Sequence, residues 1–229
     1  MHVERMILIP GLGADERLFG PQRATGLTFE VPTLPVPKRN EDMTRYAGRV
    51  CELLRLDDGP CVLGGVSFGG MLACEMAAHC DARAVVLIAA CRDRAAIPRY
   101  YYGAELVSRL LPDVLIRRRC ATSSRLLAGL ENLDTEQFEL IHDMAQRISV
   151  PFVRRTARMI LGWRGAAEPA CPVYHVHGRL DRVIPIRQLR PDVVIEEGGH
   201  LINMTHAVQV NQFITDSLSR HLRARAAYA

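Results

Sequence analysis

The chain has 229 residues, of which 48% are hydrophobic and 24% are charged, with a formal net charge of +4 at pH 7. This composition is typical of one globular domain with a sizeable core, and it excludes a disordered or fibrous chain. The small basic excess and the 6% aromatic content also give no indication of nucleic-acid binding.

Apolar runs alternate with segments of helical spacing along the chain. Several runs are apolar throughout, which is typical of parallel strands covered on both faces. We therefore predict an α/β protein with a mostly parallel six-stranded sheet and helices on both faces. The predicted strands cover 5–9, 27–31, 60–66, 84–90, 172–177 and 192–196, and the predicted core helices cover 43–56, 69–79 and 205–222.

The first predicted strand leads into a glycine-containing loop, Pro10–Asp15. Gly11 and Gly13 do not make this a phosphate-binding loop, because the lysine or third glycine of such loops is missing. No nucleotide cofactor is therefore expected.

A tight strand-to-helix turn carries Ser67 between Gly65 and Gly69 in the pattern G-x-S-x-G. Such a turn strains the backbone at the serine, and side chains two residues to either side would collide across it. Both glycines are therefore required. The helix start that follows directs backbone N–H groups towards negative charge forming at Ser67, so the arrangement is typical of a nucleophile.

The strand pattern stops over residues 92–165, where short helical segments follow one another. Asp134 and Gln137 have the spacing of a capping box, which predicts an ordered helix. We expect a helical cap at 92–165 that covers the carboxyl ends of the strands and shapes the substrate pocket, inserted into a core made of 1–91 and 166–229.

The basic excess of the chain lies in this predicted cap, which has 13 arginines and 8 acidic residues. The clusters Arg117–Arg119 and Arg154–Arg155 with Arg158 would suit an acidic partner, such as an acyl carrier protein, or a substrate carboxylate. A solvated helix face is the commoner role for such arginines. Tyr100–Tyr102 would either reach the pocket or pack at the base of the cap.

Two further candidates lie on loops after later strands. A serine hydroxyl needs a histidine base and an acid that orients the histidine. Asp181 follows one strand, with Pro185 suited to the first turn of a helix beyond it. His200 follows the next strand through Gly198–Gly199, which allow the loop to fold the imidazole towards Ser67.

The order Ser67, Asp181, His200 and the glycine-flanked serine make nearly the whole chain resemble the α/β-hydrolase superfamily. The resemblance implies a catalytic triad of these three residues. It also implies an oxyanion hole made by the backbone N–H groups of Leu12 and Phe68.

Two departures qualify the resemblance. Pro10 stands before Gly11, where a common form of the loop begins with histidine and glycine, but the donor is a backbone group and the hole is expected to survive. Asp93, which follows the strand 84–90, is the alternative acid, because some members of the superfamily place theirs there.

We therefore predict a serine hydrolase that cleaves a carboxylic ester or thioester of a small acyl substrate, with no cofactor and no metal. One alternative is a lyase, isomerase or cyclase of a biosynthetic pathway that uses the same residues for proton transfer. Another is a ligand-binding module on the same fold.

The remaining histidine and cysteine patterns predict no further chemistry. His175 and His177 share a strand face, as metal ligands would, but no third ligand pairs with them and a structural role is expected. The seven cysteines lack the spacings of a disulfide or zinc framework and are expected to be reduced core residues. The chain has no apolar run of 18 residues, and its first residues lead into a predicted strand. We therefore expect no signal peptide and a cytoplasmic protein without a membrane partner.

Overall fold

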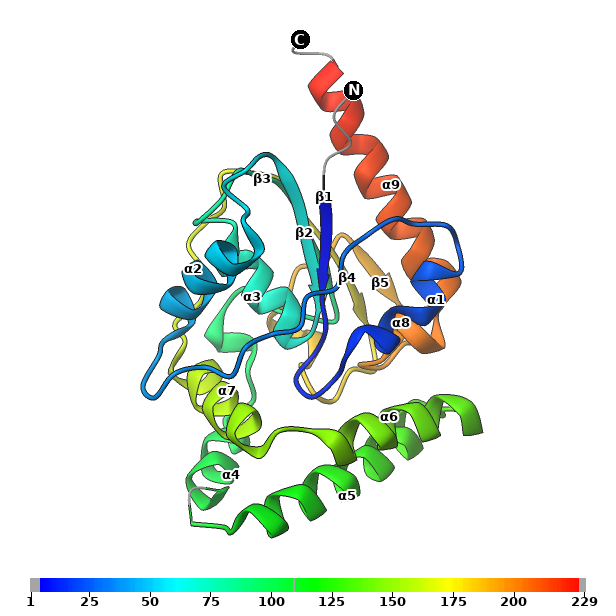
Figure 1. The fold of residues 1–229 in the computed structure, drawn as a ribbon. Coiled ribbons are helices and arrows are strands. Elements are labelled where there is room, and N and C mark those ends of the chain that lie inside the picture. The colour runs from blue at the N-terminus through cyan, green and yellow to red at the C-terminus, as the bar shows by residue number, and fades with distance from the viewer. Residues whose placement is uncertain (1–4, 109, 227–229) are drawn as a thin grey trace.

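Five parallel strands form one sheet in the order β1-β2-β3-β4-β5 in the computed structural model, which describes residues 5–108 and 110–226. Each strand pairs with the next in chain order, for example Ile7 with Leu63 and Leu87 with His175. In Figure 1 the strands run towards the helices drawn at the bottom of the view, so their carboxyl ends share one edge of the sheet. The strands are β1 (Arg5–Ile9), β2 (Cys61–Val66), β3 (Ala82–Ile88), β4 (Val173–Gly178) and β5 (Val193–Ile195).

Helices cover both faces of the sheet, as predicted (Figure 1). One face packs against α2 (Met43–Leu54) and α3 (Phe68–Met76). The other packs against α8 (Ile202–Thr205) and α9 (Ala207–Ala226), and α1 (Gly20–Arg23) contacts both of these helices. The α/β fold class is therefore confirmed.

Helix α2 illustrates why these segments become helices. Its N-terminus is capped by the Asp42 side chain, which accepts a hydrogen bond from the Arg45 N–H at 2.8 Å. Its buried residues recur three and four positions apart, so that one stripe faces the core. They are Met43, Tyr46, Ala47, Val50 and Cys51.

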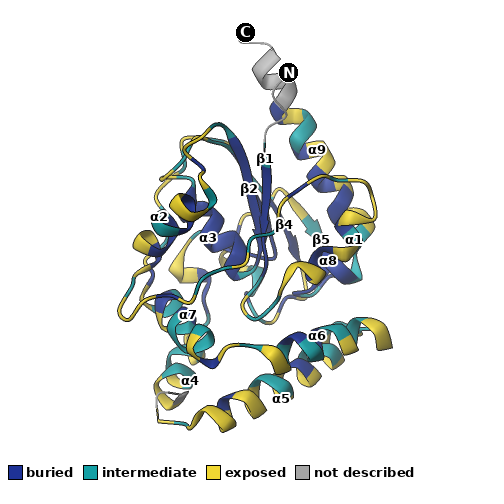
Figure 2. Ribbon diagram, in the orientation of Figure 1, coloured by how far each residue is buried: buried dark blue, intermediate teal, exposed yellow. Residues whose placement is uncertain are grey.

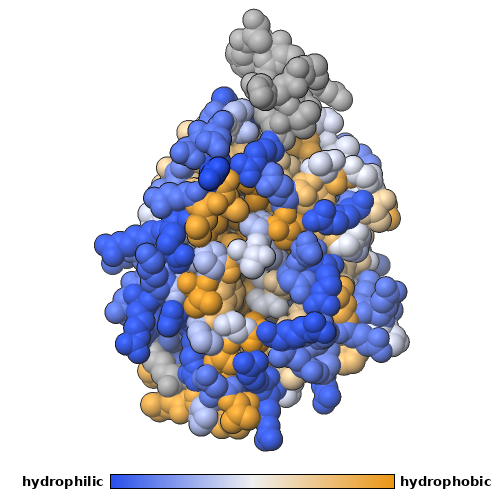
Figure 3. Space-filling model, viewed as in Figure 1, coloured by the Kyte–Doolittle hydropathy of each residue, from blue (hydrophilic) through white to orange (hydrophobic). Residues whose placement is uncertain are grey.

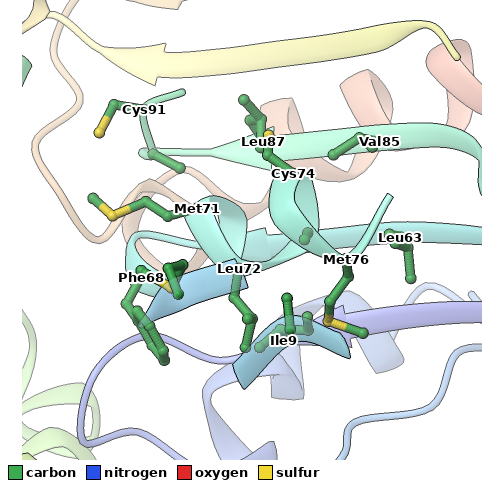
Figure 4. Packing of buried hydrophobic residues seen from close by; sticks show 14 of the residues in the cluster. Ile9, Leu63, Phe68, Met71, Leu72, Cys74, Met76, Val85, Leu87 and Cys91 are labelled. Carbon is green, nitrogen blue, oxygen red and sulfur yellow. The ribbon is translucent and has the colours of Figure 1, made fainter. Parts of the chain in front are cut away.

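Helix α3 is buried along its whole length, in contrast to the half-exposed α2 (Figure 2). Phe68, Met71 and Leu72 pack against Ile9 and neighbouring strand residues in the cluster drawn in Figure 4. The single charged side chain of α3, Glu75, is also buried. It accepts hydrogen bonds from the Trp163 indole at 2.5 Å and from the Thr44 hydroxyl at 3.0 Å. Helix α3 is therefore held in place by packing and hydrogen bonds along its whole length.

The predicted sixth strand at 27–31 is wrong. This segment makes only an isolated parallel bridge between Glu30 and Ile7. The Glu30 N–H donates to Met6 O at 2.8 Å, and the Leu8 N–H donates to Glu30 O at 2.9 Å. The prolines from Pro32 onward lack the N–H groups that would continue a ladder, so the segment leaves the sheet edge after one bridge.

The C-terminal part of the core also differs in detail from the prediction. Pro185 does precede a helical turn, but that turn is a 3₁₀ helix of three residues, Ile186–Gln188. The predicted helix 205–222 corresponds to α9, which begins at Ala207, and α8 is a separate short helix before it. Within the described residues, no helix is long and apolar enough to cross a membrane.

The segment between β3 and β4 is helical, apart from its connections. It holds a 3₁₀ turn (Arg94–Ala96) followed by α4 (Tyr100–Ser108), α5 (Asp113–Glu131), α6 (Thr135–Arg147) and α7 (Val150–Gly162). We refer to α4–α7 as the helical insertion. The capping box is present, since Asp134 accepts from the Gln137 N–H at 2.8 Å and the Gln137 side chain accepts from the Asp134 N–H at 3.3 Å. Figure 1 shows the insertion below the carboxyl edge of the sheet.

Candidate functional site

Ser67 occupies the single residue between β2 and α3, with φ 55° and ψ −122°. A positive φ is unfavourable for a residue with a side chain, and such strain persists only where the surroundings impose it. Here they do, because the Ser67 N–H donates to Ile88 O at 3.0 Å and Ser67 O accepts from the Gly70 N–H at 3.0 Å. The serine is thus held on a rigid turn at the carboxyl end of β2.

The glycines on either side of Ser67 are required by close packing. A Cβ on Gly65 would collide with the backbone of Gly69, and a Cβ on Gly69 would collide with the Ile9 carbonyl oxygen. A Cβ on Gly70 would meet the Ala90 side chain. The turn can therefore approach β1 this closely only without side chains at these positions.

Asp181 lies on the loop after β4 and is 4% exposed. Its Oδ1 accepts from the Val183 and Ile184 N–H groups, each at 2.8 Å. Its Oδ2 lies 2.8 Å from His200 Nδ1 and 3.2 Å from His177 Nε2. Burial alone would raise the pKa of Asp181, but the charge of His200 and these hydrogen bonds hold it well below its usual value. The carboxylate is therefore kept ionised.

His200 lies on the loop after β5 and is 6% exposed. Burial disfavours its charged form, but the negative charge of Asp181, the hydrogen bond to it and the charge of Glu131 raise the pKa of His200. Because Nδ1 donates to Asp181, Nε2 is the ring nitrogen left to accept a proton.

The structure brings Asp181 and His200 together and gives Asp93, the alternative acid, a different contact. Asp93 instead caps the 3₁₀ turn that follows it, where its Oδ1 accepts from the Ala95 N–H at 2.7 Å. Ser67 and His200 line the same cavity. Within the described residues, no hydrogen bond joins the Ser67 hydroxyl to the imidazole. Such contacts often tighten only when substrate binds.

His175 and His177 stand behind Asp181 in a buried chain of hydrogen bonds. His175 Nε2 lies 3.1 Å from His177 Nδ1, and His177 Nε2 lies 2.8 Å from Ile184 O. Burial lowers the pKa of His175 to about 3, with further contributions from His177 and Arg92, so the ring is neutral and can donate to His177. His175 Nε2 and His177 Nδ1 are therefore occupied by their mutual hydrogen bond, and the Nε2–H of His177 points to Asp181. The sequence reading missed this role because a period of two reports only a shared strand face.

The two predicted oxyanion donors come from different parts of the chain, the loop after β1 and the start of α3. Phe68 is the first residue of α3, so its N–H has no partner within the helix. Leu12 lies on the loop after β1, where a Cβ on Gly11 would stand 3.6 Å from Ser67 Cβ. Among the hydrogen bonds of the described residues, none uses the N–H of Leu12 or Phe68 as donor. Both residues line the cavity at Ser67.

A cavity of about 470 Å³ extends from Ser67 and His200 into the helical insertion. Core residues such as Phe68 and Met71 form one wall, and insertion residues such as Ile116, Leu127 and Ile160 form the other. Most of the lining is apolar, which suits the hydrocarbon part of a ligand.

A second cavity of about 460 Å³ lies on the other side of the loop after β1. Gly13 and Ile148 line both cavities, and a Cβ on Gly13 would collide with the Ile148 side chain. In the space-filling view, apolar side chains gather in the middle of the face where the insertion meets the core (Figure 3). Ile148 therefore stands at the partition between the two cavities.

The arginines and tyrosines singled out in the sequence have mixed roles. Arg155 donates to Pro37 O at 2.8 Å and Arg158 contacts Asn40 Oδ1 at 3.5 Å, so both tie the insertion to a core loop. Tyr101 lines the cavity, whereas the exposed Tyr100 donates to Arg182 O at 3.2 Å. Arg118 and Arg119 remain exposed on α5.

One residue that the sequence reading missed contacts the His200 loop directly. Glu131, the last residue of α5, accepts from the His200 N–H at 2.6 Å through Oε1 and from the Leu201 N–H at 2.9 Å through Oε2. No local pattern marks this glutamate, because its partners lie 69 and 70 residues further along the chain.

Comparisons with known proteins agree on the fold. A model of the alpha/beta hydrolase family matches residues 6–213. A putative aryl esterase from Burkholderia cenocepacia is 17% identical, with a TM-score of 0.74 and coverage of 97% of this chain and 92% of that one. A thermophilic esterase from Thermogutta terrifontis is 21% identical, with a TM-score of 0.68 and coverage of 96% and 90%.

The enol-lactonase from Burkholderia xenovorans LB400 is similar as well, at 16% identity and a TM-score of 0.73, with coverage of 95% and 92%. At such identities the likeness to solved structures shows the fold alone. A comparison with curated proteins finds no match.

Proposed function

Because the chain belongs to the alpha/beta hydrolase family, we propose that it is a serine hydrolase that cleaves a carboxylic ester through Ser67, His200 and Asp181. The observation that carries this proposal is the placement of a backbone-strained serine on the wall of the cavity that also holds His200, hydrogen-bonded to a buried carboxylate. A structural serine or a loop histidine would need neither the strain nor the buried partner.

In the proposed reaction, His200 Nε2 takes the hydroxyl proton of Ser67 as Ser67 Oγ attacks the acyl carbonyl carbon. Asp181 holds the imidazole through Nδ1 and stabilises its positive charge. The N–H groups of Leu12 and Phe68 bind the oxyanion of the tetrahedral intermediate. The imidazolium then gives its proton to the leaving alcohol, and an acyl-enzyme remains.

Water then hydrolyses the acyl-enzyme, with His200 again acting first as a base and then as an acid. His200 takes a proton from the water as the water attacks the acyl carbon, and Ser67 Oγ leaves with that proton. The products are a carboxylic acid and the free enzyme.

The cavity supports an apolar acyl group as the substrate. Its lining by Met71, Ile116 and Leu127 would exclude water from an acyl chain, and its 470 Å³ lies within the range of small-molecule sites. The helical insertion then acts as a lid that encloses the acyl chain.

A thioester is the second candidate, favoured by the basic surface of α5. Arg118 and Arg119 are exposed on α5, and Arg119 also lines the cavity, so they would meet an acidic acyl carrier protein or an anionic carrier group. Arg155 and Arg158 contribute less to such a surface than their sequence suggests, because each contacts a core loop.

Intact-mass spectrometry after reaction with a fluorophosphonate tests the proposal. We expect one adduct on the wild-type protein, no adduct on Ser67→Ala and strongly slowed labelling of His200→Ala. Ser123→Ala is the matched control, since Ser123 lines the same cavity and none of the hydrogen bonds among the described residues joins it to a histidine. Its labelling should equal that of the wild type.

Substrate class follows from a panel of acyl esters and acyl thioesters graded by chain length. Folded wild-type protein that resists labelling and cleaves neither class would contradict the proposal. It would favour proton-transfer chemistry or ligand binding at the same cavity.

A further inference from the structure

Glu131 lies where the helical insertion touches the candidate active site. Its two carboxylate oxygens accept from the N–H groups of His200 and Leu201, at 2.6 and 2.9 Å. These two N–H groups flank the Cα of His200, so the pair of hydrogen bonds fixes the backbone from which the imidazole projects. Asp181 fixes the ring itself through Nδ1.

The position of Glu131 in its own helix is unfavourable for a carboxylate. It is the last residue of α5, followed by the left-handed cap residue Asn132. A negative charge at the C-terminal end of a helix opposes the helix dipole. The two charge-assisted hydrogen bonds to the His200 loop offset this cost, so the contact explains a residue that helix stability alone would disfavour.

Gly199 leaves room for the carboxylate. A Cβ on Gly199 would collide with both carboxylate oxygens and the carboxyl carbon of Glu131. Gly199 does not have a positive φ. Space for Glu131 is therefore the specific reason for glycine at this position.

We propose that Glu131 is a positioning residue through which the helical insertion sets the orientation and the basicity of His200. This inference rests on the proposed function, because it assigns His200 the role of general base. In this arrangement the His200 loop on the core is held in its working position only when α5 packs against it.

Two charged groups face His200, Asp181 from the loop after β4 and Glu131 from α5. Both favour the imidazolium, and burial opposes it. Removal of the Glu131 charge should therefore lower the pKa of His200. A carboxylate whose only role is to hold the fold would leave that pKa in place.

Three substitutions separate the contributions of Glu131. Glu131→Ala removes both acceptors and the charge. Glu131→Gln keeps one acceptor without the charge, and Glu131→Asp keeps the charge but is one methylene too short to reach both N–H groups. The control is Asp143→Asn, which breaks another contact between insertion and core, the 2.8 Å ion pair of Asp143 with Arg17.

For Glu131→Ala we expect kcat for an activated ester to fall roughly 10- to 100-fold with little change in KM, as for other small misplacements of a catalytic group. The acid limb of the pH–rate profile should move to lower pH in Glu131→Ala and Glu131→Gln. In Glu131→Asp kcat should fall while the acid limb stays near that of the wild type. Asp143→Asn should keep the wild-type kcat and profile.

Gly199→Ala approaches the same contact from the other side. It should displace the Glu131 side chain and reproduce most of the Glu131→Ala defect. In the double variant the two losses should not add, because both remove one interaction.

A titration of the His200 imidazole by NMR distinguishes failure of this inference from failure of the proposed function. The lower imidazole pKa in Glu131→Gln is expected whether or not any ester is cleaved. Wild-type kcat, acid limb and imidazole pKa in folded Glu131 variants, with only a lower Tm, would overturn the inference. An unreactive Ser67 with a shifted imidazole pKa would instead overturn the hydrolase proposal.

Discussion

Opposing influences act on the pKa of His200, and their balance predicts the pH dependence of activity. Burial lowers this pKa, whereas the charges of Asp181 and Glu131 raise it above the ordinary value of 6.5. A general base must be neutral, so activity is lost as the pH falls through the raised pKa. We expect the acid midpoint of kcat/KM for an ester to lie above pH 6.5. A midpoint well below pH 6 would show that His200 is not the base.

Asp181→Asn should strongly lower kcat, although asparagine and aspartate have nearly the same size. The amide can still accept from the Val183 and Ile184 N–H groups but can present an N–H to His200, which favours the wrong tautomer. We expect kcat to fall by about 10³- to 10⁴-fold. Asp93→Asn is the control, because Asp93 only caps a 3₁₀ turn. Equal losses in the two variants would contradict the assignment of the acid.

The sequence predicts the residues that local pattern defines and misses those that distant contacts define. Ser67 and its glycines form one continuous motif, and Asp181 and His200 stand on loops after strands. Glu131 carries no such mark, since its partners are 69 and 70 residues away. The choice of Asp181 over Asp93 likewise depends on which loop reaches His200, a property of the folded sheet.

At the scale of elements, the turn between β2 and α3 should tolerate no side chain at Gly69. A Cβ there would collide with the Ile9 carbonyl, and neither β1 nor the fully buried α3 can move away. We expect Gly69→Ala to lower the free energy of unfolding by at least about 3 kcal/mol. Urea denaturation followed by circular dichroism measures this.

Gly129→Ala provides the matched control for that substitution. Gly129 lies inside α5, and a Cβ there would meet nothing within 4 Å. Alanine has the higher helix propensity, so the free energy of unfolding should rise by about 0.5 to 1 kcal/mol. If Gly129→Ala lost as much stability as Gly69→Ala, the collision with the Ile9 carbonyl would not be the cause of the loss.

The prediction of strands was correct for strands that are buried on both faces of the sheet. It failed for the segment 27–31 at the edge of the sheet. The apolar runs of β2 and of β3 after Arg83 are typical of strands buried on both faces. The segment 27–31 alternates apolar and polar residues as a strand would, but whether it pairs depends on how long it follows β1, and it pairs at Glu30 alone. Helix ends in the insertion were predictable where a side chain caps them, as Asp134 does for α6.

At the scale of the whole molecule, core and insertion share both the cavity at Ser67 and the support of the His200 loop. Ser67, Asp181 and His200 come from loops of the core, while Ile116 and Leu127 of α5 face them across the cavity. Glu131 joins the two parts through the His200 loop. The division into 1–91 and 166–229 against 92–165 remains a prediction, and these contacts describe how the two parts would cooperate.

The buried pair of Asp181 and His200 should also leave a signature in the stability of the whole molecule. A carboxyl whose pKa is lowered from 3.8 stabilises the fold above pH 3.8, and this contribution is lost as the pH falls through the lowered value. An imidazole whose pKa is raised from 6.5 stabilises the fold below pH 6.5, and this contribution is lost as the pH rises through the raised value.

Both contributions are therefore present together only between about pH 4 and pH 6.5. We expect the free energy of unfolding of the wild type to exceed that of Asp181→Asn by roughly 3 to 5 kcal/mol in this window, and the difference to shrink on both sides. Urea denaturation of both proteins from pH 3 to pH 9, each in a Ser67→Ala background, measures the difference without any acyl-enzyme. A difference that stays constant across this range would show that Asp181 and His200 do not form a charged pair in the folded protein.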